Sequence, residues 1–236
     1  MAKTNKWEQN NSSKVNIRKN KIAQNIYCII ALSGFILMLG VEKYIMKGNL
    51  EMFAKYWSAD RDEFSNRDTD ALIGWKENYP YISDCHKIID IGCGIGNTVD
   101  WLTKKGHSAL GITYQDKEVT EAKRLNRLVL KCDMHDLDTN YDDTRYNPPF
   151  DAFIMWDSLE HSIAPLVALC EAKKATRNGG KGIIFIPSQD WIECRYHIIV
   201  PTIRQMKHLL ILAELEINDI IDMGNEQAVY KLIVKK

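Results

Sequence analysis

Residues 88–96 read Ile88-Ile89-Asp90-Ile91-Gly92-Cys93-Gly94-Ile95-Gly96, and this stretch decides the fold. An apolar run broken by one aspartate predicts a buried strand, and the glycines after it predict a sharp turn into a helix. Glycine permits positive φ and lets a ligand approach the backbone where no Cβ stands. In open α/β sheets such turns lie at the carboxyl ends of the strands, where ligands bind.

Short apolar runs and longer amphipathic runs alternate after this stretch. The expected strands cover 87–91, 108–113, 127–132, 150–155 and 182–187, with weaker ones near 216–221 and 228–234. The expected helices cover 97–105, 117–126, 164–176 and 203–213. This alternation predicts a Rossmann-like α/β fold, in which a seven-stranded, mostly parallel sheet carries helices on both faces.

The N-terminal part of the chain has a different composition. Residues 1–21 are polar and basic and predict a flexible tail. Residues 22–41 carry no charge, and as a helix they would span roughly 30 Å, the thickness of a bilayer core. We therefore expect an apolar helix over 22–45 that associates with a membrane, although a core helix, an interfacial helix or a later translation start fits the same composition. Residues 46–236 form the expected main domain.

Charge and cysteine usage exclude several classes of protein. Lys and Arg together number 31, as do Asp and Glu, so the chain has no general attraction to nucleic acid. The six cysteines lie far apart without a C-x-x-C pair, which argues against a zinc site or a disulfide framework. We expect reduced thiols in a cytoplasmic domain, with the apolar helix as its candidate anchor.

The spacing of the glycines distinguishes between two nucleotide-binding families. The stretch reads D-x-G-x-G-x-G, whereas NAD enzymes carry G-x-G-x-x-G. It resembles motif I of class I S-adenosylmethionine-dependent methyltransferases of the type 11/23 kind, and the resemblance extends collinearly over about residues 86–236. The resemblance implies S-adenosylmethionine as cofactor, with Asp90 ordering the loop and reaching toward the amino group. The residues that it places around the methionine part are Gly92, Cys93, Gly94 and Gly96.

The second expected strand departs from the family pattern. The family normally ends this strand with an acidic residue that binds both ribose hydroxyls, but Thr113 stands here, followed by Tyr114. A threonine offers one hydroxyl instead of a bidentate carboxylate. The stretch resembles the G-I-T variant of cyclopropane-fatty-acid-synthase-like members. Thr113 and Tyr114 remain expected cofactor-binding residues, and Gln115 or Asp116 is the expected source of the missing acceptor.

The third expected strand leads into Cys132-Asp133-Met134-His135-Asp136-Leu137, which resembles the family's G-D-x-x-D-L stretch. The resemblance implies that Asp133 accepts a hydrogen bond from the adenine N6 amine and that Met134 packs on the ring. The alternative for Asp133 is a loop carboxylate that caps the next turn.

The fourth expected strand ends in Trp156-Asp157-Ser158-Leu159-Glu160-His161, which resembles the family's L-E-H pattern and implies a position facing the sulfonium and the acceptor. Trp156 is an expected cofactor contact. His161 is the candidate general base because its unperturbed pKa lies near neutrality, and Glu160 is the second catalytic candidate; the alternative for His161 is a purely orienting role. Asp157, Glu160 and His161 also resemble the E-x-x-E-H metal site of ubiquinone-biosynthesis O-methyltransferases, but we expect no metal.

These features predict a methyltransferase that acts on an oxygen or nitrogen atom of a small-molecule or lipid-like acceptor. Residues 189–200, which contain Trp191, Tyr196 and His197, are expected to line the acceptor pocket. A catalytically silent cofactor-binding scaffold is the alternative. A nucleic-acid methyltransferase fits less well because the fourth strand lacks an N/D-P-P-Y/F ending and the domain has no basic tract.

Overall fold

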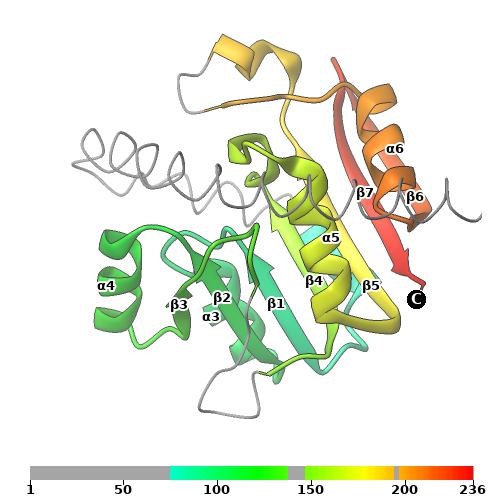
Figure 1. Cartoon of the computed structure of the whole chain (residues 1–236). Helices are drawn as coiled ribbons and strands as arrows, with labels where there is room; N and C mark the ends of the chain where they lie inside the picture. The colour runs from blue at the N-terminus through cyan, green and yellow to red at the C-terminus, as the bar shows by residue number, and fades with distance from the viewer. Residues whose placement is uncertain (1–74, 138–146, 194–196, 236) are drawn as a thin grey trace, which may run out of the picture. The chain divides into compact units, whose positions relative to one another are not determined.

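A computed structural model of the chain describes residues 75–137, 147–193 and 197–235 (Figure 1). The predicted tail 1–21 and the predicted apolar helix 22–45 lie outside the described residues. Within the described ranges, no helix has the length and hydropathy needed to cross a bilayer.

Seven strands form one sheet in the order β3-β2-β1-β4-β5-β7-β6. The strands are β1 (Lys87–Ile91), β2 (Ser108–Thr113), β3 (Val129–Lys131), β4 (Phe150–Trp156), β5 (Thr176–Ile186), β6 (Leu215–Gly224) and β7 (Gln227–Val234). The first five are parallel, and β7 pairs antiparallel with both β5 and β6. The predicted Rossmann-like, mostly parallel sheet is therefore confirmed, with the strand of the glycine motif near its centre.

Helices cover both faces of this sheet, α5 and α6 in front and α3 behind it (Figure 1). The α-helices are α3 (Asn97–Lys104), α4 (Asp116–Arg124), α5 (Pro165–Ala175) and α6 (Ile203–Leu212), and the 3-10 turns are η1 (Tyr79–Tyr81), η3 (Leu159–His161) and η4 (Gln189–Glu193). Alternate residues of a strand face opposite sides. Ile89 and Ile91 accordingly pack into the cluster under α5 and α6, whereas Ile88 packs with Val99 and Leu102 of α3.

The fifth strand begins earlier than the sequence predicts. The expected strand covers 182–187 after a glycine turn, but β5 starts at Thr176, which pairs with Phe150. The pairing register shifts between Phe150 and Ala152, so the extra residues form an irregularity within the strand. Gly180 fits there because a Cβ at this position would lie 2.8 Å from the carbonyl oxygen of Asp151.

Asp151 joins three chain segments at the amino ends of the strands. Its Oδ2 accepts hydrogen bonds from the backbone amides of His86 and Lys87, both at 2.8 Å, and its Oδ1 accepts one from Arg177 Nε at 2.7 Å. Burial alone would raise the pKa of Asp151, but these three hydrogen bonds outweigh burial and hold the pKa below its usual range. The carboxylate thus stabilises the junction of β1, β4 and β5 only while it is ionised.

We expect Asp151→Asn to lower the free energy of unfolding by about 2–3 kcal/mol at neutral pH, because an amide cannot accept all three hydrogen bonds. The pKa is lower in the folded state than the unfolded value of about 3.9, so this stabilisation is present above that value and is lost as the pH falls through the folded-state pKa. Urea unfolding at a series of pH values measures both effects. Asp84→Asn is the control, since this exposed carboxylate forms a surface ion pair with Lys181 and should change stability by at most about 1 kcal/mol. Equal losses in the two variants, or a loss in Asp151→Asn that persists in acid, would contradict this role.

Candidate cofactor and acceptor site

The glycine turn after β1 is attached to the carboxyl end of β2. The amides of Gly92 and Cys93 both donate to the carbonyl oxygen of Ile112, at 2.9 and 3.0 Å. Gly92, Gly94 and Gly96 all have positive φ, at 82°, 57° and 79°, and Gly96 is the N-cap of α3. The turn is therefore a fixed part of the sheet edge, and it leads directly into the helix.

The three glycines of the turn serve different purposes. A Cβ on Gly92 would lie 2.4 Å from Ser158 Cβ, and a Cβ on Gly96 would lie 2.6 Å from Val129 Cγ2. These two glycines are required for close packing. Among the described residues, a Cβ on Gly94 would meet only Glu118 Oε1, at 3.9 Å. Gly94 is therefore the position where a ligand can approach the backbone.

Cys93 packs toward the interior of the domain. Gly111 of β2 lacks the side chain that would collide with it, since a Cβ there would lie 2.4 Å from Cys93 Sγ. The Cys93 thiol therefore packs against β2, and the Cys93 amide donates a hydrogen bond to Ile112. Asp90 of β1 is 4% exposed and lies between its sheet partners Gly111 and Ile154.

Glu118 is a candidate site residue that the motif comparison did not select. This residue of α4 is only 9% exposed, and its Oε2 accepts a hydrogen bond from the Thr113 hydroxyl. Its other oxygen lies beside Gly94. A carboxylate therefore stands at the end of β2 after all, although it comes from the following helix.

The sequence suggested Gln115 or Asp116 as the missing acceptor, but neither side chain is buried beside Thr113 and Gly94 as Glu118 is. Asp116 points outward, with its side chain 79% exposed and bound to Lys131 at 2.7 Å. Gln115 is the N-cap of α4, and its amide donates to the Thr113 hydroxyl at 3.4 Å. One sequence signal did point to Glu118, because a glutamate at the third helical position commonly bends back toward the start of its helix.

The segment after β3 holds the predicted adenine-binding residues. Asp133 accepts two hydrogen bonds from His135, one from its backbone amide at 2.9 Å and one from its Nδ1 at 2.7 Å. Met134 is partly buried against the cluster under α5 and α6. Tyr114 directly follows β2, the strand that pairs with β3, and Lys131 Nζ lies 5.8 Å from its ring centroid.

Trp156 belongs to an aromatic group on the other face of the sheet. Its ring stacks on Phe185 with a centroid separation of 4.8 Å and meets Trp75 edge-on at 5.7 Å. Both contacts lie in the cluster with α3. The adenine-binding candidates and Trp156 thus flank the carboxyl ends of the strands from opposite faces.

Glu160 and His161 form η3, which directly follows β4. The Glu160 side chain is completely buried, whereas that of His161 is 21% exposed, and His161 Nε2 lies 3.7 Å from Glu160 Oε1. The backbone oxygen of Glu160 accepts hydrogen bonds from the amides of Ile198 and Ile199, which bring His197 to a ring separation of 5.0 Å from His161. Of the two predicted catalytic residues, only His161 is accessible to an acceptor.

The structure does not form the cluster that the metal alternative required. Asp157 is exposed, has a positive φ of 53° and precedes η3, so it shares no helical face with Glu160 and His161. His197 takes its place, since the candidate ligand atoms of Glu160, His161 and His197 lie within 4.8 Å of one another. This arrangement pairs an accessible imidazole with a buried carboxylate, which suits proton transfer as well as metal binding.

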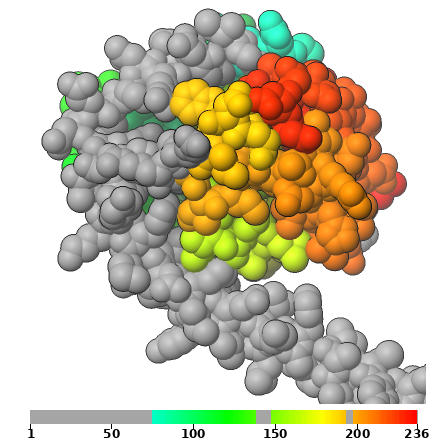
Figure 2. Space-filling model, turned by 90° about the horizontal axis from the view of Figure 1, so that it is seen from above, coloured from blue at the N-terminus to red at the C-terminus, as the bar shows by residue number. Residues whose placement is uncertain are grey.

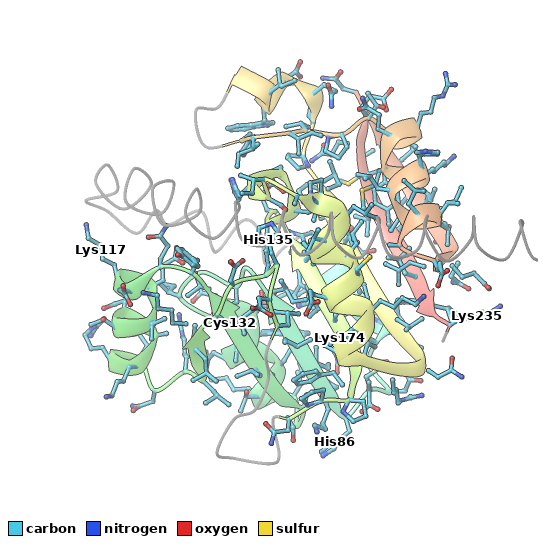
Figure 3. The ribbon with its side chains drawn as sticks, in the orientation of Figure 1. His86, Lys117, Cys132, His135, Lys174 and Lys235 are labelled. Atoms are coloured by element: carbon cyan, nitrogen blue, oxygen red, sulfur yellow. The ribbon has the colours of Figure 1, made fainter. Side chains whose placement is uncertain are left out.

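The candidate residues gather at one end of the sheet. His135 lies at the carboxyl ends of the strands and His86 at the opposite end (Figure 3). Seen from above, the segment that follows β5 is at the surface (Figure 2). Trp191, Ile192 and Ile198 of this segment are 48%, 56% and 42% exposed. The accessible face near His161 and His197 is therefore rich in apolar side chains.

Comparison with known proteins agrees with this geometry. Residues 89–184 match the family model described as a methyltransferase domain. A search of curated proteins found no match.

Solved structures share the fold at low sequence identity. An S-adenosylmethionine-dependent methyltransferase from Clostridium acetobutylicum has a TM-score of 0.56 at 14% identity, over 81% of this chain and 100% of its own. A similar methyltransferase from Archaeoglobus fulgidus has a TM-score of 0.55 at 16% identity, and the match covers 77% of this chain and 99% of that one. The 1,6-didemethyltoxoflavin-N1-methyltransferase of Burkholderia thailandensis was solved with S-adenosylhomocysteine. It has a TM-score of 0.53 at 16% identity, and the match covers 77% of this chain and 90% of that one. The chain therefore has the fold of these S-adenosylmethionine-dependent methyltransferases, and its residues 89–184, which include the glycine turn, are similar to a methyltransferase domain.

Proposed function

We propose that this protein transfers a methyl group from S-adenosylmethionine to an oxygen or nitrogen atom of a small, apolar or lipid-like acceptor. The observation that carries the proposal is the space beside Gly94, which has a buried carboxylate, Glu118, next to it. Burying a carboxylate is costly unless it is hydrogen-bonded. In this proposal the paired hydroxyls of a ligand donate to the Glu118 carboxylate, which also accepts a hydrogen bond from Thr113.

The residues at the carboxyl ends of the first three strands fit the parts of the cofactor. Gly94 leaves room for the methionine part, Glu118 offers acceptors to the ribose hydroxyls, and Asp133 offers a carboxylate to the adenine amine. Each lies at the same edge of the sheet, because the strands are parallel. In this proposal Glu118 takes the role that family members assign to an acidic residue at the end of the second strand.

The acceptor side is formed by η3 and the segment after β5. When bound, S-adenosylmethionine supplies an electrophilic methyl group, and alignment of donor and acceptor contributes most of the rate. His161 takes the proton that a hydroxyl or ammonium acceptor must lose, and the buried Glu160 carboxylate stabilises the imidazolium that results. Trp191, Ile192 and Ile198 favour an apolar acceptor, because exposed apolar side chains gathered in one segment typically mark a binding surface.

We expect Glu118→Gln to weaken S-adenosylhomocysteine binding about tenfold and Glu118→Ala to weaken it further, because a hydrogen bond to a charged group contributes about 1.5–3 kcal/mol. Isothermal titration calorimetry on the full chain measures both. Asp116→Asn is the matched control, since this carboxylate lies two residues away and is exposed. Unchanged affinity in both Glu118 variants would remove Glu118 from the site.

We expect Gly94→Leu to abolish S-adenosylhomocysteine binding, because the side chain would fill the space beside the turn. Gly106→Leu controls for backbone strain, since Gly106 also has positive φ, at 93°, and a Cβ on it would meet no atom within 4 Å in the part of the chain that the structure describes. Calorimetry should detect binding in Gly106→Leu alone. Binding that survives in Gly94→Leu would show that the ligand lies elsewhere.

We expect His161→Asn to lower methyl transfer about a hundredfold or more, the usual contribution of a general base, and to leave S-adenosylhomocysteine affinity nearly unchanged. Methyl-labelled S-adenosylmethionine incubated with a cell extract, followed by separation into organic and aqueous phases, measures transfer. The label should enter the organic phase. His208→Asn, an exposed histidine of α6, is the control. Label confined to aqueous products would refute the apolar acceptor, and binding without any transfer would favour the silent scaffold.

A further inference from the structure

A chain of hydrogen bonds connects the segment after β3 to the segment after η3. His135 lies at its centre, with Nδ1 2.7 Å from Asp133 Oδ1 and Nε2 2.7 Å from Ser162 Oγ. His135 is 3% exposed and Ser162 is 0% exposed. Ser162 directly follows His161, so the chain joins the adenine side of the site to the acceptor side.

The direction of each hydrogen bond follows from the chemistry of the groups. An ionised carboxylate only accepts, so Nδ1–H of His135 donates to Asp133. In a neutral imidazole the other nitrogen then accepts, and the Ser162 hydroxyl donates to it. The Ser162 oxygen in turn accepts from the backbone amide of Ala164 at 3.2 Å. Every polar atom of the two buried side chains has a partner, and this arrangement defines one orientation of the imidazole.

His135 binds only one of the two carboxylate oxygens of Asp133. The backbone amide and the Nδ1 of His135 both donate to Oδ1. The carboxylate is thereby held against rotation from one side. Its side chain is still 22% exposed, so Oδ2 can accept a hydrogen bond from a bound ligand.

We propose that His135 is a positioning residue for base recognition: it fixes the Asp133 carboxylate so that Oδ2 selects a base with an exocyclic amine, and it makes this selection depend on Ser162 of the acceptor-side segment. The inference rests on the proposed function, in which Asp133 contacts adenine. It goes beyond that function by assigning His135 and Ser162 to cofactor selectivity. Both residues act through Asp133 and do not touch the cofactor.

The test compares S-adenosylhomocysteine with S-inosylhomocysteine, in which a carbonyl oxygen replaces the N6 amine and repels the carboxylate. Calorimetry on the native full-length chain should show at least a tenfold preference for the adenine compound, as expected for one charge-assisted hydrogen bond. His135→Ala should reduce this preference to about threefold or less. His135→Asn retains a donor near the position of Nδ1 and should recover part of it. Ser162→Ala, the mildest change, should give an intermediate preference.

His107→Ala is the matched control for loss of a buried, doubly bonded imidazole. His107 is 9% exposed and contacts the Tyr79 hydroxyl at 2.8 Å and the Cys85 carbonyl at 2.6 Å, before β2 at the opposite end of the sheet. It should lose thermal stability and retain the native preference for adenine. Circular dichroism confirms folding, and Ser162→Ala decides the matter if His135→Ala does not fold.

Three results overturn the proposal. Native preference retained in His135→Ala or in a folded Ser162→Ala shows that the chain of bonds is only structural, and equal loss in His107→Ala shows that any destabilisation has this effect. A native chain that binds both compounds equally refutes base selection while leaving the proposed function intact. A native chain that binds neither compound refutes the proposed function and this inference together.

Discussion

The site depends on how the glycine turn is held against β2. Two consecutive amides, of Gly92 and Cys93, donate to a single carbonyl oxygen, that of Ile112. Cys93 fits over Gly111 because that strand position has no side chain. These contacts fix the start of α3 and orient the outer side of the turn at the end of the sheet. The first five strands are parallel, so their carboxyl ends lie at the same edge of the sheet. The elements that follow β2, β3 and β4 therefore place Glu118, Asp133 and His161 at this edge.

The fold follows from local patterns, so most of it could be predicted from the sequence. The strands around the glycine motif are mostly apolar and buried on both faces, as expected for central parallel strands. β1 and β2 accordingly have the predicted bounds. The early start of β5 was not predicted, because Thr176–Gly180 combines polar residues with glycines and reads as a turn. Only its pairing with Phe150 in the folded sheet makes it a strand.

The candidate site was predicted less completely, for a physical reason. Motif residues that belong to a strand end, such as Gly94 and Asp133, are located by the fold itself. Glu118 lies in a mostly polar helix, where a charge usually faces solvent, and its burial and its contact with Thr113 become visible only in the folded structure. His197 lies next to His161, and Ser162 next to His135, although the members of each pair are far apart in the sequence. Periodicity cannot reveal such contacts.

The central claim is that the space beside Gly94 and Glu118 holds S-adenosylmethionine. A crystal structure of the chain with S-adenosylhomocysteine tests it most directly. We predict the ribose hydroxyls within hydrogen-bond distance of the Glu118 carboxylate, the adenine amine at Asp133 Oδ2 and the homocysteine part beside Gly94. Density for the compound at another place, or a ribose whose hydroxyls contact Asp116 in place of Glu118, would contradict the account.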